Sequence, residues 1–393
     1  MTSKPPFDGV QSVPVKDVFD LQMGKTPSRN VTEYWNNGDH DWVSIKDLGS
    51  YGKYVGRTKE TISNLGVAES RIKVVPENTL IMSFKLSLGK TAITVAPTYT
   101  NEAIMAFLNK KAFPIDLNYM YHQFSAKDWT AGTNIAVMGK TLNKKTLGAA
   151  HICVPNIETQ REIASRLDYV CEQIRLVKQQ LALLDELVKS RFVEMFDGAP
   201  WQVVRASDVM TSFRNGVSPS KDGDIHERVL TLSAITQGYF DETAWKDGTF
   251  KELPASDKRV SDSDFYICRG NGNKQLVGAG EFADANHPEL VFPDTMIAGT
   301  INKNLVRKPF LTQVWKHPSV RRQIEAKART TNGTLKINQK IVSEIRFPLP
   351  PLDVQDEFAS FIERVDKLRV EAQAQKEKLQ TLYDSLAQDY FAI

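Results

Sequence analysis

The sequence predicts an α+β protein with two tandem modules, each followed by a long helix, and the two helices pair as an antiparallel coiled coil around a pseudo-twofold axis. Three observations predict this fold. Residues 151–196 align without a gap with residues 346–391, and 11 of the 46 pairs are identical. Both segments carry a seven-residue apolar repeat. Short alternating apolar runs fill the remaining residues. A unit used twice indicates two similar bodies joined by helical spacers.

Composition favours a soluble globular chain. The 393 residues allow two or three domains, and 41% hydrophobic with 25% charged residues is an ordinary balance. No run of about 18 apolar residues is present, so we expect no membrane span. The first residues lack the apolar core of a signal peptide. Cys153, Cys171 and Cys268 lack metal-ligand spacing and suit a reducing compartment. We therefore expect a cytoplasmic protein.

The charge is distributed unevenly along the chain. Residues 1–150 contain 18 Lys and Arg against 13 Asp and Glu, and residues 198–345 contain 20 against 17. The helix-bearing segments are acidic, with 6 against 8 in residues 151–197 and 6 against 9 in residues 346–393. This favours nucleic acid as a ligand of the modules and protein as a partner of the helices. Ordinary surface charge explains the same counts, so this alternative stays open.

The first helix is predicted from a strict heptad pattern. We expect a capping box of Thr159 and Glu162 at its start. Apolar residues then recur at alternating spacings of four and three, which is typical of a supercoiled helix pair. They are Ile163, Leu167, Val170, Ile174, Val177, Leu181, Leu184 and Val188.

The second helix repeats this seam with a polar interruption. Phe358, Ile362 and Val365 open the seam, and Arg369, Ala372 and Lys376 follow at its centre. The polar centre is either a docking surface or a solvated stretch. The seam resumes with Leu379, Tyr383, Leu386 and Tyr390. Helices of about 37 residues would be about 55 Å long. Candidate coil or partner contacts are Leu167, Ile174, Leu181, Val188, Ile362, Leu379 and Leu386.

The repeat continues more faintly inside the modules. Gly24-Lys-Thr-Pro-Ser28 matches Gly216-Val-Ser-Pro-Ser220, and Trp42–Asp47 matches Val229–Ala234. Gly132-Thr133 matches Gly333-Thr334. Alternating runs predict strands at Thr79–Phe84, Ala92–Val95, Phe265–Cys268 and Leu290–Phe292, and we expect short helices at Asn101–Lys110 and Ser319–Arg329. We interpret Trp35 as a core aromatic residue.

These motifs resemble the specificity subunits of type I restriction–modification enzymes. The resemblance begins with Gly24-Lys-Thr-Pro-Ser-Arg29, Glu33-Tyr-Trp35 and Trp42-Val-Ser-Ile-Lys-Asp47, which look like the opening of a target-recognition domain. It continues with the inner strand and loop of Leu80–Thr91 and with the matching Cys268-Arg-Gly-Asn-Gly-Asn273. Phe347-Pro-Leu-Pro-Pro-Leu352 with Gln355 resembles the family's strand-to-helix junction. The first junction, Cys153-Val-Pro-Asn-Ile157, keeps a single proline.

The resemblance implies a DNA-recognition subunit with four parts. Residues 1–150 and 198–345 would be target-recognition domains, and residues 151–197 and 346–393 would be the family's spacer helices. Each domain would contact one half of a bipartite double-stranded DNA target. The helices would bind two copies of a modification subunit, which holds S-adenosylmethionine and methylates adenine, and restriction subunits would join this core. The chain itself would need no cofactor.

Base reading requires loop side chains with bidentate donors and acceptors, and backbone positioning requires cations and hydroxyls near phosphates. Loops of both modules supply these residue types. In the first module the candidate DNA-binding residues are Lys25, Thr26, Ser28, Arg29, Tyr34 and Lys85. In the second they are Ser220, Lys221, Arg269, Asn271, Asn273, Lys274, Asn332, Lys336 and Asn338.

The sequence offers no catalytic or metal-binding residue. Leu88-Gly-Lys-Thr91 is not a phosphate-binding loop, because Phe84 stands where the motif requires glycine. Asp294, Glu325 and Lys327 spell a nuclease triad, but the last two lie in a segment predicted as helix. The six histidines lack metal-ligand spacing. Two alternatives remain: a stand-alone DNA-modifying enzyme, and a coiled-coil scaffold whose modules bind protein.

Overall fold

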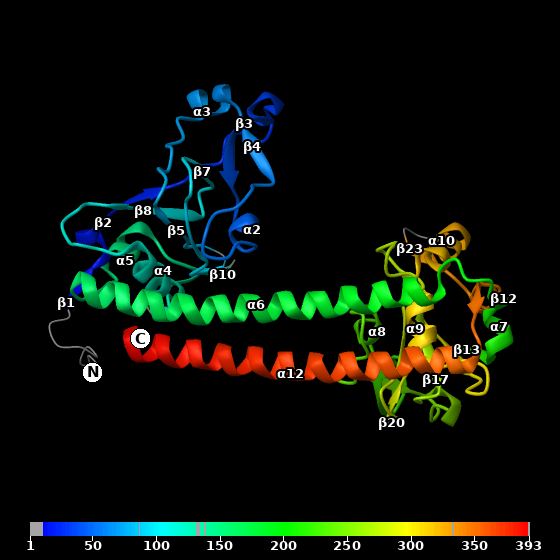
Figure 1. The fold of residues 1–393 in the computed structure, drawn as a ribbon. Coiled ribbons are helices and arrows are strands. Elements are labelled where there is room, and N and C mark those ends of the chain that lie inside the picture. Colours follow the sequence, from blue (N-terminus) through cyan, green and yellow to red (C-terminus); the bar gives the residue numbers. More distant parts are fainter. Residues whose placement is uncertain (1–10, 86, 131–133, 137–138, 332–333, 392–393) are drawn as a thin grey trace. The chain divides into compact units, whose positions relative to one another are not determined.

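The computed structural model describes residues 11–85, 87–130, 134–136, 139–331 and 334–391. The chain divides into two units (Figure 1). The first unit holds Met1–Gln179 with Gln373–Ile393, and the second holds Gln180–Ala372. The long helices α6 (Ile157–Phe196) and α12 (Leu352–Phe391) each contribute to both units. The helices are therefore not separate bodies, since each unit contains a module and a segment of each helix.

The first module contains a four-stranded sheet in the order β2-β8-β5-β6 and a three-stranded sheet in the order β4-β3-β7. Two-stranded pairs β1-β11 and β10-β9 complete it. The strands are β1 Gln11–Pro14, β2 Phe19–Met23, β3 Trp35–Val43, β4 Glu60–Ile62, β5 Leu80–Ser83, β6 Thr91–Ile93, β7 Tyr99–Thr100, β8 Ile104–Asn109, β9 Asn134–Ala136, β10 Gly139–Thr141 and β11 His151–Val154. The short helices are α1 Val15–Val18, η1 Thr32–Tyr34, α2 Ile45–Leu48, α3 Asn64–Ser70, α4 Leu117–Ala126 and α5 Lys144–Ala149.

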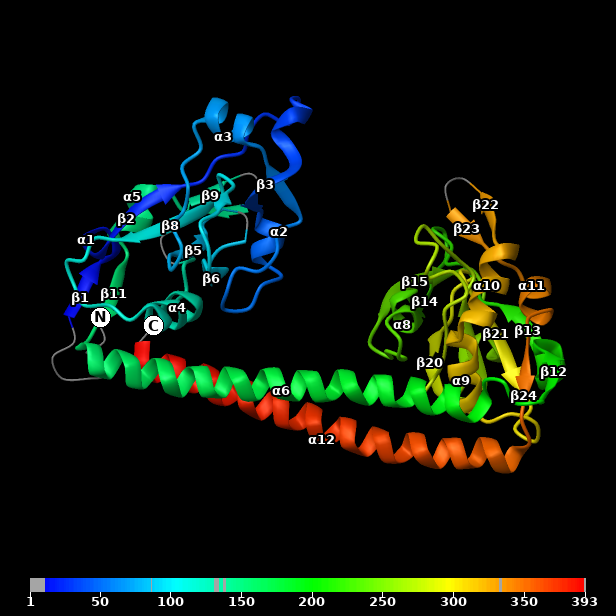
Figure 2. The ribbon, with the colours of Figure 1, turned by 45° about the horizontal axis from the view of Figure 1, so that its top comes forward.

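The second module has the same kind of sheets, in the orders β13-β21-β17-β19 and β15-β14-β20-β16, with β18-β23-β22 and β12-β24. In Figure 2 the β22–β23 hairpin lies on the side of this module away from α6 and α12. The strands are β12 Gln202–Arg205, β13 Met210–Asn215, β14 Ile225–Leu230, β15 Trp245–Phe250, β16 Arg259–Val260, β17 Asp264–Cys268, β18 Gly270–Asn271, β19 Gly280–Phe282, β20 His287–Val291, β21 Met296–Ile301, β22 Arg329–Thr331, β23 Thr334–Lys336 and β24 Arg346–Leu349. The short helices are α7 Ala206–Val209, α8 Ser233–Thr236, η2 Ser256–Lys258, α9 Lys308–Lys316, α10 Pro318–Lys327 and α11 Gln339–Ser343.

Equivalent glycines confirm the match between the two motif loops. Gly24 donates its backbone N–H to Ile104 O at 3.1 Å, and Gly216 donates to Met296 O at 3.3 Å. A Cβ at Gly24 would lie 2.2 Å from Thr100 O, and one at Gly216 would lie 2.1 Å from the carbonyl oxygen of Phe292. Only glycine permits this approach of two backbones. The first residues of the repeated motif are thus explained by the same contact in both modules.

The seam predicted for α6 is buried along its length. Leu167 is fully buried, and Ile163, Val177 and Leu184 are at most 8% exposed. Leu181 is half-buried, so it is the weakest member of the seam. In the second unit the two helices run antiparallel, because Asp185 pairs with Arg369 whereas Arg191 pairs with Glu357, each at 2.7 Å.

The interrupted seam of α12 is less buried than that of α6. Phe358, Val365 and Ala372 are buried. Ile362, Leu379, Leu386 and Lys376 are half-buried. Arg369 at the polar centre forms a salt bridge to Asp185 across the helix pair, so the interruption contains an interhelical ion pair and is not merely solvated.

Two equivalent glutamines fasten the helices to their modules. Gln160 and Gln355 are both fully buried near the helix starts. Gln160 accepts from Asp116 N at 2.8 Å and donates to Pro114 O and Pro155 O at 3.0 and 2.8 Å. Gln355 repeats this pattern, accepting from Arg307 N at 2.8 Å and donating to Leu305 O and Pro350 O at 3.1 and 2.8 Å. The identity of these residues in the repeat therefore has a structural cause.

Replacing Gln355 by leucine is expected to destabilise the second unit. The change would leave one backbone N–H and two carbonyls without partners inside the protein, and each unsatisfied group costs about 1–3 kcal/mol. Urea denaturation followed by circular dichroism measures the loss. Gln180→Leu, at an exposed position of α6, is the matched control and should leave the midpoint nearly unchanged. Equal midpoints for the two variants would contradict the role of Gln355 as an anchor.

The structure corrects two expectations. Residues 101–110 do not form a helix: β8 runs from Ile104 to Asn109 in the middle of its sheet, paired with β2 and β5. Its first four residues are buried on both faces, and such a run has no periodicity that separates strand from helix. The cap of α6 is also wrong. Asn156, not Thr159, caps the helix by accepting from Thr159 N at 2.8 Å, and Glu162 pairs with Arg166.

Other expectations for local structure are confirmed. Each of the four predicted strands overlaps an observed strand (β5, β6, β17 or β20), and the predicted helix at Ser319–Arg329 corresponds to α10. Trp35 is half-buried and packs with the buried Trp42 in a small apolar cluster. Among the described residues, no helix is both long and apolar enough to cross a membrane.

Candidate nucleic-acid interface

In each module a tight turn brings together two loops that are far apart in the sequence. In the first module Thr26 donates its hydroxyl hydrogen to Glu102, and Phe84 N donates to Ala103 O at 3.0 Å. In the second module Asp294 N donates to Val217 O at 3.2 Å, and Arg269 N donates to Thr295 O at 2.8 Å. The motif loop and the inner-strand loop therefore meet at the same place in both modules.

The predicted residues of the first module differ in their freedom to contact a ligand. Lys25 is exposed and donates to Ser70 O at 2.6 Å, and Ser28 is also exposed. Lys85 is half-buried beside the ring of Phe84. Tyr34 is only 8% exposed and donates its hydroxyl hydrogen to Glu69. Tyr34 is therefore committed to the module interior, and its placement among the DNA-binding candidates is not supported by its position.

Arg29 is held in place by two kinds of contact. Its guanidinium lies 3.7 Å from the ring centroid of Trp35 and 5.0 Å from that of Trp42. It also makes two hydrogen bonds to the carboxylate of Glu60, at 2.6 and 3.1 Å. Glu60 begins the edge strand β4. The side chain of Arg29 remains 49% exposed, but the two nitrogens that form its fork are already paired.

The predicted loop of the second module joins a small sheet. Gly270 and Asn271 form β18, which pairs with β23, where Lys336 opposes Gly270. Ile337 N donates to Arg269 O at 2.8 Å. This pairing places the candidates at 269–274 beside those at 336–338. Asn332 lies outside the described residues.

Several candidate asparagines of this loop also support the backbone. Asn271 accepts from Asn273 N at 2.8 Å, and Asn273 accepts from Gln275 N at 3.0 Å. Asn338 caps α11 by accepting from Ile341 N at 2.9 Å. Such turns and caps are common roles for asparagine. Lys274 pairs with Glu325 at 3.4 Å, and the exposed Lys336 makes no printed ion pair within the described residues.

Ser220 and Lys221 lie on a different part of the second module, along the edge strand β15. Ser220 N donates to Thr249 O at 2.7 Å. Both residues line a shallow hollow of about 280 Å³ with His226 and Asp247. Sequence reasoning missed two exposed residues on the same strand pair: Arg228 of β14 and Trp245 of β15. The available signal was an arginine in an alternating strand pattern opposite an exposed tryptophan.

The junction between helix and module is polar in the first unit. His122 of α4 is fully buried, and its ring nitrogens lie 2.7 Å from Asp168 of α6 and 3.0 Å from the hydroxyl of Tyr383 of α12. Lys53 donates to Asp168 at 2.6 Å. Burial lowers the pKa of His122, although its bond to Asp168 opposes the shift. Burial alone would raise the pKa of Asp168, but the bonds from His122 and Lys53 hold it below its usual value.

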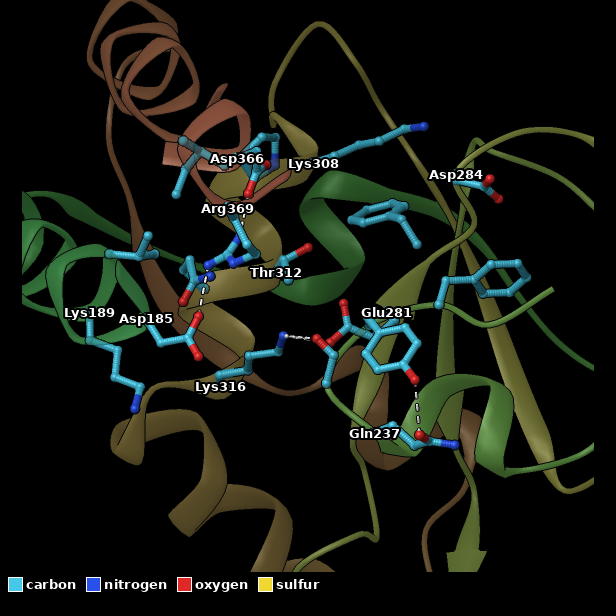
Figure 3. A pocket seen from close by; sticks show the side chains of 18 of the residues that line it. Asp185, Lys189, Gln237, Glu281, Asp284, Lys308, Thr312, Lys316, Asp366 and Arg369 are labelled. Carbon is cyan, nitrogen blue, oxygen red and sulfur yellow. Dashed lines mark hydrogen bonds and ion pairs between the residues drawn. The ribbon is translucent and has the colours of Figure 1, made fainter. Parts of the chain in front are cut away.

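The corresponding junction of the second unit is open. Gln313 of α9 stands six residues after Arg307, as His122 stands six after Asp116, and it lines a hollow of about 880 Å³. Figure 3 shows Arg369 directed at Asp185 and Lys316 directed at Glu281, which pairs with Lys316 at 2.5 Å. Burial raises the pKa of Glu281, and Lys316 opposes the rise. The two junctions are equivalent in topology but not in chemistry.

Among the described residues, no group of three or more His, Cys, Asp or Glu side chains is arranged to hold a metal ion. The triad spelled by Asp294, Glu325 and Lys327 does not assemble as an active site. Glu325 and Lys327 lie on α10, where Glu325 pairs with Lys274 and Lys327 pairs with Glu344.

The family profile for the type I restriction modification DNA specificity domain matches the chain twice, at residues 8–186 and 199–381. The chain belongs to this family. Both matches contain one of the loop pairs described above. The chain also contains the two modules and two long helices in the order that the resemblance implied.

Known proteins resemble the chain in sequence and fold. The specificity subunit of the type I restriction enzyme MjaIX of Methanocaldococcus jannaschii is 28% identical over 186 residues, which cover 46% of this chain and 42% of that protein. The chain thus aligns with less than half of that relative. Solved structures share the fold at low identity. One, from work on assembly and conformational transition of the type I R-M system, has a TM-score of 0.60 at 16% identity, with 98% of each chain covered. The S subunit from M. genitalium has a TM-score of 0.52 at 15% identity, with 99% of each chain covered.

Proposed function

We propose that this chain is the sequence-specific DNA-binding subunit of a type I restriction–modification complex. Each module reads one half of a bipartite double-stranded target, and partner subunits methylate adenine or cleave. One observation carries the proposal: both family domains present a pair of polar loops that meet at an equivalent turn. Loops on a rigid sheet are suited to present side chains to base edges.

An exposed apolar stripe on α6 supports the proposal of protein partners on the helices. Tyr169, Leu176 and Leu183 are spaced by seven residues and are 67%, 43% and 61% exposed. Leu187 continues the stripe and is 46% exposed. The stripe is separate from the buried seam, so α6 has a second heptad face for another helix. We propose that two modification subunits dock on the helices and that restriction subunits join them.

The proposed function is tested by co-expressing this chain with a modification subunit and profiling methylated adenine across the genome by single-molecule sequencing. We expect one bipartite motif that is absent without this chain. Purified complex should bind the corresponding duplex, with affinity that falls as salt rises. A scaffold whose modules bind protein would produce no motif. Such a result would overturn the proposal.

We propose that the chain contributes specificity without catalysis, that it acts in the cytoplasm, and that S-adenosylmethionine belongs to the modification subunit. Titrating S-adenosylmethionine into the purified chain in a calorimeter should give no binding heat. Saturable binding would instead favour a stand-alone modifying enzyme.

The two half-sites are expected to be read independently. Arg29→Ala should weaken recognition only of the half-site read by the first module, and Asn273→Ala only of the other half-site. A lost base contact costs roughly 1–3 kcal/mol. Competition binding with duplexes altered in one half-site at a time measures the effect. If both variants lost discrimination in the same half-site, the assignment of modules to half-sites would be wrong.

A further inference from the structure

Arg228 is an exposed arginine with unused hydrogen-bonding capacity. It lies in β14 and makes no hydrogen bond or ion pair within 4 Å to any residue that the structure describes. Five N–H donors of its guanidinium therefore face solvent or a ligand. Most other candidate residues of the two modules have at least one partner within the protein. Arg228 is the exception on the strand pair that also carries Ser220 and Lys221 at its edge.

Arg228 is nevertheless held in place. Its guanidinium carbon lies 4.7 Å from the ring centroid of Trp245, a cation–π distance. In the register of β14 and β15, Arg228 opposes Asp247 and Leu230 opposes Trp245. Arg228 and Trp245 are thus diagonal neighbours on one face. Trp245 is itself 36% exposed. The stack restricts the arginine without using its donors, which lowers the entropy cost of a later contact.

The first module contains the same pairing in a different state. Arg29 also lies flat on a tryptophan, but Glu60 occupies two of its nitrogens. In Arg29 the fork that could recognise a base is satisfied inside the protein. In Arg228 it is open. Both lie by the edge of the module's second sheet, so the modules share an arginine–tryptophan device with opposite availability.

We propose that Arg228 is a base-reading residue of the second module and that it recognises guanine through two hydrogen bonds, to O6 and N7, with Trp245 as its positioning residue. The inference rests on the proposed function. Arginine to O6 and N7 of guanine is a geometric match that no other base offers. The shallow hollow lined by Ser220 and Lys221 supplies neighbouring groups for the backbone.

The test uses the complex with its modification subunit and the duplex defined by methylation profiling. Each guanine of the half-site read by the second module is replaced in turn by 7-deazaguanine, which lacks the N7 acceptor. For the wild type we expect one replacement to weaken binding by about 5- to 150-fold. For Arg228→Ala the same replacement should have no effect. Insensitivity of the wild type at every guanine, or a half-site without any G·C pair, would overturn the assignment.

Two further variants keep the test decisive if Arg228→Ala folds poorly. Arg228→Lys preserves the charge but not the fork. It should retain salt-dependent binding and lose the preference for guanine. Trp245→Leu should weaken discrimination at the same base pair, with a smaller change at the others. Retained guanine preference in both variants would contradict the proposal.

Arg29→Ala is the matched control, since it removes the other stacked arginine. It should leave discrimination in the second half-site unchanged. If the wild-type complex methylates no specific sequence, the proposed function fails and this inference fails with it. If the wild type methylates a bipartite motif and Arg228→Ala keeps full discrimination, only the assignment of Arg228 fails.

Discussion

Leu184→Asp is expected to unfold the second unit's helix packing, whereas Leu183→Asp, one residue earlier, is expected to leave the fold intact. Leu184 is 8% exposed and packs in the core with Val188 and Phe192. Leu183 is 61% exposed on the outer face of α6. Losing a buried leucine costs about 2–5 kcal/mol before the penalty of an unpaired buried charge. A surface substitution usually changes stability by no more than about 0.5 kcal/mol.

The same two variants separate folding from assembly. Thermal unfolding of the purified chain should show a large loss only for Leu184→Asp. Size-exclusion chromatography with the modification subunit should show impaired complex formation for both, because Leu183 belongs to the exposed stripe. Complex formation by Leu183→Asp at wild-type levels would show that the stripe is not the docking surface. Leu181, the position favoured by the heptad pattern alone, is half-buried and would give a mixed result.

Adding one heptad to both long helices is expected to lengthen the non-specific spacer of the DNA target. Seven residues add about 10.5 Å of helix, close to three base-pair steps of about 3.4 Å. The points suggested by the division of the chain are after Gln180 in α6 and after Ala372 in α12. A site near Ser190 is less suitable, since Phe192 and Phe196 beyond it are buried in the second unit's core. A full heptad preserves the seam.

Methylation profiling of the insertion variant tests whether the helices set the spacing. Both half-sites should keep their sequences while the spacer grows. A four-residue insertion in α6 alone is the control. It rotates the seam by about 40° and should abolish activity. An unchanged spacer with full activity in the seven-residue variant would show that the helices do not determine the distance.

The helices were the most predictable part of the fold. The spacing of Ile163, Leu167 and Val170 encodes burial within a few turns, so the seam could be identified without tertiary information. The anchor glutamines were visible as identical residues in the repeat. Their role was not, because it depends on carbonyls about 45–50 residues away in the sequence. The end of the α6 cap was missed because Asn156 and Thr159 are both good capping residues.

The loops were predictable as a class but not residue by residue. Their composition indicated a polar binding surface, and the structure brings the motif loop and the inner-strand loop together in each module. It also shows that Tyr34 is buried and that several asparagines hold turns. Residues 101–110 were misread as a helix because β8 is apolar on both faces. A fully buried strand gives no alternating pattern.

The sequence by itself determined the two-module organisation, the heptad helices and the family motifs, because these depend on residues that are neighbours along the chain or are repeated in it. Only the tertiary structure decided which donors are free. Arg29 and Arg228 are both arginines in polar segments with a tryptophan nearby. One is paired with Glu60, a residue 31 positions away, and the other is not paired within the described residues. The availability of a hydrogen-bond donor depends on contacts between distant segments, and local pattern does not contain that information.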